Sequence, residues 1–145
     1  MSRIEKEPGI GRQLFASAID LREGAQALLA LGGQNQYVQS VAVLCHQSAE
    51  RMMCAYISLN GIHVEAGEDS TYDLWNLCRN HNPELEEAEI DAEALVDCGW
   101  VDFPQDSKTI QKAIESAIRL EKAMLQAAPG LASGYGHTDN MEMKM

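Results

Sequence analysis

YVQSVAVLCHQSAERMMCAYISLNG, residues 37–61, is the stretch that decides the fold of this chain. At ~100° per residue, its small and apolar side chains share one wide arc, and most polar side chains lie on the opposite side. The apolar arc holds Val41, Leu44, Cys45, Ala49, Met52, Ala55, Tyr56 and Leu59. The polar arc holds Gln39, Ser40, His46, Gln47, Glu50, Arg51 and Ser58. So wide an apolar surface is typical of the central helix of a bundle, so we expect other helices to surround it.

Four other segments carry helical periodicity or helix boundary signals. The first runs from about Gly11 to just before Gly32–Gly33, and the second from Ser70 to His81. The third runs from Asn82–Pro83 to Gly99, and the fourth from Asp106 or Ser107 to just before Pro129–Gly130. Ser or Asn caps, Pro at the first helical position and Gly past the last are the usual boundary residues. No stretch shows sustained β alternation. The sequence therefore predicts an all-α protein, an antiparallel up-and-down bundle of four or five helices.

Length and composition limit the class of protein. A chain of 145 residues is expected to form one domain, with a helical bundle over 1–127 and a flexible, Gly-rich tail over 128–145. Nothing approaches the roughly 18 consecutive apolar residues of a membrane span, and the N-terminus lacks the apolar region of a signal peptide. The four cysteines are widely spaced without a CxxC, which favours buried, reduced thiols in a cytoplasmic protein. We expect no cofactor and no metal.

The charge balance argues against direct nucleic-acid binding. The chain has 11 Lys and Arg against 22 Asp and Glu, a net charge of −11. Binding to DNA or RNA depends on basic side chains that neutralise phosphates. The acidic run ELEEAEIDAE, residues 84–93, would repel a phosphate backbone.

His46 and Glu50 are the first candidates for chemistry. They lie four residues apart on the polar side of the central helix, where they would form a proton-handling pair or supply two metal ligands. The ordinary alternative is a helix-surface hydrogen bond at the rim of the bundle. A di-iron bundle is excluded, because no Glu is followed three residues later by His. The sequence also lacks a glycine-rich phosphate loop and a nucleophile-elbow serine.

Three motifs occur in an order typical of one family. The central helix contains AVLCHQSAERMMCAYISLNG (42–61), the next helix begins with YDLWNL (72–77), and the connector before the last helix is WVDFPQD (100–106). In this order, from about Leu14 to Leu125, the chain resembles HEPN domains. The resemblance implies a small helical bundle that commonly dimerises. Some HEPN proteins are ribonucleases of toxin systems, and others pair with a minimal nucleotidyltransferase or bind nucleotides.

The departures from the HEPN pattern concern catalysis. Tyr72 stands where many members have His, Asp102 where they have Arg, and Cys54 where Lys is usual. No Arg is followed by His after four to six residues, the spacing of the ribonuclease members. The resemblance therefore implies a non-catalytic binding or regulatory module, in a toxin–antitoxin-like context, rather than an enzyme. The candidate ligand-binding residues are His46, Glu50, Arg51, Tyr72 and Asp102.

Two alternatives stay open beside this hypothesis. One is a HEPN ribonuclease toxin with a non-standard site, which would need a basic cleft. The other is a small-ligand or metal-binding bundle that uses His46 and Glu50.

We expect a homodimer, with a nucleotidyltransferase as a second partner implied by the resemblance. Val43, Cys54 and Ile57 are apolar residues on the otherwise polar side of the central helix, and Trp75 and Trp100 add bulky apolar surface near the short helices. Apolar patches on a small acidic domain usually mark contact sites, and a two-fold contact is the commonest way to cover them.

Overall fold

Helices are the only regular secondary structure in the described part of the chain. The computed structural model describes residues 8–31, 38–100 and 105–132, and no strand occurs in these ranges. The α-helices are α1 (Pro8–Ala30), α2 (Val38–Asn60), α3 (Thr71–His81), α4 (Ala92–Cys98) and α5 (Ser107–Ala127), and the 3-10 helices are η1 (Pro83–Ala88) and η2 (Pro129–Leu131). The predicted all-α class is confirmed, and the starts of α3 and α5 match their expected caps.

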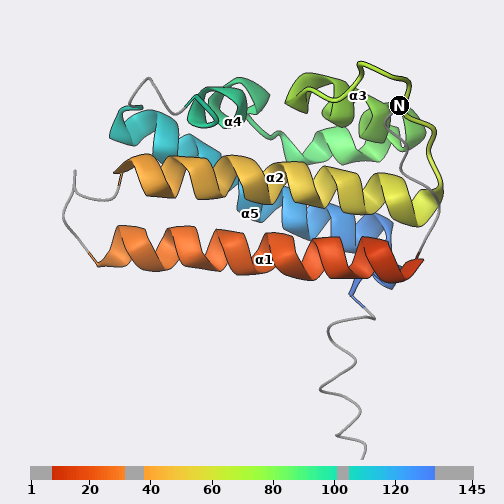
Figure 1. The fold of residues 1–145 in the computed structure, drawn as a ribbon, viewed down its shortest axis with the longest axis horizontal. Coiled ribbons are helices and arrows are strands. Elements are labelled where there is room, and N and C mark those ends of the chain that lie inside the picture. Colours follow the sequence, from red (N-terminus) through yellow and green to blue (C-terminus); the bar gives the residue numbers. More distant parts are fainter. Residues whose placement is uncertain (1–7, 32–37, 101–104, 133–145) are drawn as a thin grey trace, which may run out of the picture.

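The chain runs up and down along its long axis (Figure 1). Helices α1 and α2 lie side by side and antiparallel. The short elements α3, η1 and α4 together carry the chain back along α2, and α5 then returns in the direction of α2. The bundle thus has four antiparallel segments, of which the third is divided into short helices.

Helix α2 is central, as its wide apolar arc predicts. It contacts α1, α3, α4 and α5, and Met52 is 0% exposed. The buried Ser48 hydroxyl donates to the Ala18 carbonyl of α1 at 2.7 Å, which satisfies a polar group in this contact. Gly11 permits the close approach of α1, because a Cβ there would lie 3.1 Å from the Ala55 carbonyl oxygen.

The third segment, formed by α3, η1 and α4, differs from the prediction. The single helix expected from Asn82–Pro83 to Gly99 is wrong: η1 ends at Ala88, Glu89 has a left-handed φ of 50°, and Asp91 caps α4 with its side chain. Helix α5 stabilises this break. The Ser116 hydroxyl accepts from the Asp91 N–H at 2.7 Å, and the Arg119 guanidinium donates to the Glu89 carbonyl at 2.8 Å. Contacts from another helix therefore override the local helical pattern.

The packed chain extends beyond the expected boundary at residue 127. Ala128 donates its N–H to the Met124 carbonyl at 2.8 Å, and Leu131 of η2 is 0% exposed. The beginning of the expected tail, up to Leu131, is therefore part of the bundle. Residues 133–145 lie outside the described ranges.

The cysteines are free thiols, as expected, and Cys45, Cys78 and Cys98 are buried whereas Cys54 is half-buried. Burial raises the pKa of both Cys45 and Cys98 to about 12 and that of Cys54 to about 11. Within the described ranges, no helix combines the length and the apolar character needed to cross a bilayer.

Candidate functional site

A cavity of about 270 Å³ lies where α2 meets the start of α3 and the end of α4. We call it the α2–α3–α4 cavity. It is lined by His46, Glu50, Ser70, Thr71, Tyr72, Val96, Gly99 and Trp100. Three segments that are distant in sequence therefore contribute to one site.

The orientation of the His46 imidazole is set by α4. Its Nδ1 atom lies 2.9 Å from the Leu95 carbonyl oxygen. A carbonyl only accepts, so we assign the proton of the neutral ring to Nδ1. The other ring nitrogen, Nε2, is then an acceptor, and it lies 3.6 Å from Glu50 Oε2. This separation is longer than a hydrogen bond.

Gly99 provides the space for the imidazole. A Cβ at this position would lie 2.7 Å from His46 Cε1 and 2.8 Å from both ring nitrogens. The φ of Gly99 is −81°, which any residue adopts. The glycine is therefore required for close packing of the ring against the end of α4, and not for its backbone conformation.

The Glu50 carboxylate is held by the first turn of α3. The Thr71 hydroxyl donates to Glu50 Oε2 at 2.6 Å, and Thr71 is only 4% exposed. Thr71 is in turn placed by a capping box, in which the Asp73 N–H donates to Ser70 and the Ser70 N–H donates to the Asp73 carboxylate. These contacts fix the orientation of the carboxylate.

Two aromatic side chains stand at the rim of the cavity. Tyr72 is 47% exposed and Trp100 is 56% exposed, among the most exposed large apolar side chains of the described residues. Glu50 is the one acidic residue among those that line the cavity, and the described lining includes no Lys or Arg. The site therefore combines aromatic surface, an imidazole acceptor and one carboxylate.

The structure brings together three of the five predicted ligand-binding residues: His46, Glu50 and Tyr72. Arg51 does not line this cavity, and its guanidinium donates to the Ser17 hydroxyl of α1. Asp102 lies outside the described residues. Sequence reasoning missed Thr71 and Gly99, and it assigned Trp100 to a dimer interface.

The interface prediction is wrong for two of its residues. Ile57 is 0% exposed and Trp75 is 5% exposed, so both belong to the core. The reason is that α3 packs on the side of α2 that was expected to face solvent. Val43 and Cys54 are half-buried, and only Trp100 of the five is largely exposed.

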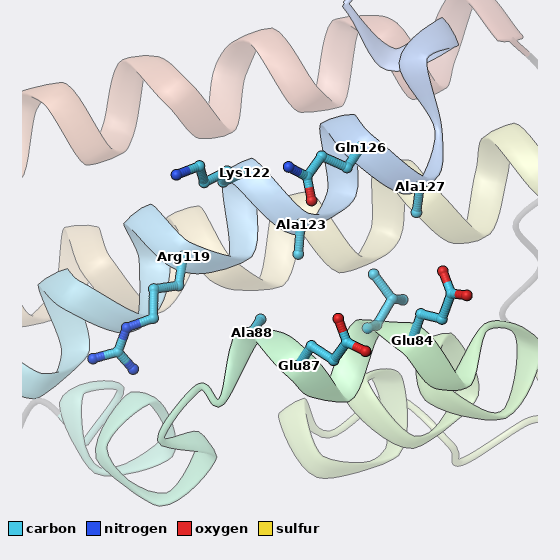
Figure 2. Close-up of a pocket in the computed structure, with 9 residues that line it drawn as sticks. Glu84, Glu87, Ala88, Arg119, Lys122, Ala123, Gln126 and Ala127 are labelled. Atoms are coloured by element: carbon cyan, nitrogen blue, oxygen red, sulfur yellow. The ribbon is translucent and has the colours of Figure 1, made fainter.

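A second hollow, of about 370 Å³, lies between η1 and α5 (Figure 2). Glu84 and Glu87 stand on the η1 side, and Arg119 and Lys122 stand on the α5 side. All four side chains are exposed. Solvent screens charges as exposed as these, so they interact with one another only weakly.

Comparisons with known proteins add no assignment. No family model, no curated protein and no solved structure matches the chain at a significant level. Within 8–31, 38–100 and 105–132, no group of three or more His, Cys, Asp or Glu is placed to hold a metal ion. The resemblance to HEPN domains stays a prediction.

Proposed function

We propose that this chain is a non-catalytic binding module whose ligand site is the α2–α3–α4 cavity. One observation carries the proposal. The Leu95 carbonyl accepts a hydrogen bond from the His46 imidazole and the Thr71 hydroxyl donates one to the Glu50 carboxylate, so both groups are held in a cavity that two exposed aromatic side chains also line. Polar groups that are already oriented lose little conformational entropy when a ligand binds, so such a site favours binding.

The charge of the lining supports binding over RNA cleavage. Phosphoryl chemistry relies on cations or fixed N–H donors that stabilise the developing negative charge. The described lining has a carboxylate and lacks Lys and Arg, and the chain lacks the Arg-to-His spacing of HEPN ribonucleases. The same lining disfavours the phosphates of a nucleotide but accepts a flat ring at Tyr72 and Trp100.

The wider context of the proposal rests on the resemblance and on composition. A HEPN-like regulatory role, a nucleotidyltransferase partner, a homodimer and a cytoplasmic location stay predictions. The metal-binding alternative also stays a prediction; His46 and Glu50, the two residues it names, line one cavity.

The test is a nuclear magnetic resonance titration of ¹⁵N-labelled protein with adenosine, phenol and N-acetylarginine methylamide. We expect at least one probe to shift the amide signals of Thr71 and Val96 in a saturable way. The shifts should disappear in Trp100→Ala and persist in Leu31→Ala, a control that removes another exposed apolar side chain (Leu31 is 70% exposed). Absence of saturable shifts for all probes, or shifts confined to the groove between η1 and α5, would contradict the proposal.

A further inference from the structure

We propose that the group recognised by the α2–α3–α4 cavity is a guanidinium, on an arginine side chain or on a small guanidino compound. This inference rests on the proposed binding function and names the ligand chemistry of the same site.

The cavity presents a pair of hydrogen-bond acceptors. Because the Nδ1–H of the imidazole donates to the Leu95 carbonyl, the ring in this tautomer presents the lone pair of Nε2 to the cavity. Glu50 Oε2 lies 3.6 Å away and is also an acceptor. The hydroxyl of Thr71 supplies one proton to Oε2 and none to Nε2. A ligand with several N–H donors would satisfy both acceptors together.

The charge of the cavity also favours a cation. The Glu50 side chain is 31% exposed, so it is partly desolvated, and the described lining includes no Lys or Arg to pair with it. A cation would form charge-assisted hydrogen bonds with this carboxylate, which are stronger than neutral ones. The net charge of −11 also attracts cations to the surface and repels phosphates and carboxylates.

The shape of the rim favours a planar cation. Tyr72 and Trp100 give the rim two exposed aromatic faces. A planar guanidinium stacks on an aromatic face and donates from its edge, whereas an ammonium is compact and strongly hydrated. Such stacking already occurs elsewhere in this protein, where the Arg79 guanidinium lies 5.5 Å from the centre of the Trp75 ring. The combination of rim, carboxylate and acceptor pair therefore fits a guanidinium better than an ammonium.

The experiment compares three matched probes by calorimetry and by the Thr71 and Val96 amide shifts: N-acetylarginine, N-acetylcitrulline and N-acetyllysine methylamides. Citrulline has the shape of arginine without its charge. We expect the arginine probe to bind about tenfold or more tightly than either of the others, because hydrogen bonds to charged groups are the stronger ones. A tripeptide with a central arginine tests whether the group is recognised within a peptide or on the free compound.

Two variants locate the recognition. Glu50→Gln removes the charge and keeps an oxygen that accepts from Thr71, so we expect it to fold and to bind the arginine probe about tenfold more weakly. Glu23→Gln removes one exposed negative charge on α1 and serves as the control, with unchanged affinity. Equal binding of citrulline, tighter binding of lysine, or an unaffected Glu50→Gln variant would overturn the guanidinium assignment. If adenosine or phenol binds at the cavity and arginine does not, the inference fails while the proposed binding function stands, and if nothing binds both fail.

Discussion

Replacing Gly99 with alanine tests whether the end of α4 fixes the His46 imidazole. The added Cβ would lie 2.7 Å from His46 Cε1, so the ring has to move by about 0.7 Å to reach the 3.4 Å at which ordinary contact begins. The Nδ1 atom is 2.9 Å from the Leu95 carbonyl oxygen, and a shift of this size away from α4 takes it beyond hydrogen-bonding distance. The substitution therefore breaks the contact that orients the ring.

The free energies involved are similar in size and opposite in sign. Losing the bond between His46 and Leu95 costs about 0.5–1.5 kcal/mol. Alanine at a compatible backbone angle, here a φ of −81°, gains about 0.4–1 kcal/mol by restricting the unfolded chain. We therefore expect Gly99→Ala alone to change the free energy of unfolding by less than about 1 kcal/mol. In a His46→Ala background the steric conflict is absent, so the same substitution should stabilise the protein by about 0.4–1 kcal/mol.

Urea unfolding of the wild type, the two single variants and the double variant measures this difference. The expected coupling between positions 46 and 99 is about 0.5–1.5 kcal/mol. Gly24→Ala is the control, because a Cβ there meets only Leu44 Cδ1, at 3.8 Å, and its effect should be the same in both backgrounds. Equal effects of Gly99→Ala with and without the imidazole would show that Gly99 does not make room for His46.

Four further outcomes are expected. Met52→Asp places a charge at a residue that is 0% exposed, so it should lower the free energy of unfolding, measured by urea titration, by more than about 3 kcal/mol. Gln47→Asp, on the exposed side of α2, is the control and should have little effect. In the native protein Cys45 and Cys98 have pKa values of about 12, against 9.0 in an unfolded chain, so between these pH values the folded protein keeps two protons that the unfolded chain loses. The contribution of these thiols to the free energy of unfolding is therefore complete below pH 9 and is lost as the pH rises toward 12. Thiol labelling at pH 8 should be slow until urea unfolds the protein. Purified protein should leave labelled single-stranded RNA intact; cleavage that His46→Ala abolished would place a ribonuclease site on α2. Light scattering at micromolar concentration should give the mass of a homodimer, and a monomer mass that persists on concentration would contradict the dimer.

The sequence predicts the helices well where one signal dominates. The apolar arc of residues 37–61 is wide enough that only a central position buries it, and the capping residues Ser70 and Asp106 fix the starts of α3 and α5 locally. The break at Glu89 was not predictable in this way. It depends on Ser116 and Arg119 of α5, which bond to the backbone of Asp91 and Glu89, 25 and 30 residues away in the chain.

The candidate site was partly predictable for a similar reason. His46 and Glu50 share a helix face, so their spacing alone places them together. The contributions of Thr71 and Gly99 depend on how α3 and α4 pack against α2, which spacing within one helix does not reveal. Ile57 and Trp75 were predicted to lie at an exposed interface but are buried, because a polar helix face is exposed to solvent only when no other helix covers it.

Helix α4 has only seven residues, which is too short for an isolated helix to persist in water. It stays helical because Leu95 and Cys98 are buried, because Ser116 accepts from the N–H of its N-cap residue Asp91, and because the Leu95 carbonyl in its middle accepts from His46. With so few attachments, its amides should exchange with deuterium through local opening, at a lower free energy than those of α2. A ligand that contacts Trp100 and His46 would then slow deuterium uptake specifically in residues 92–98. Binding in the cavity would therefore raise the free energy of local opening of this one short helix.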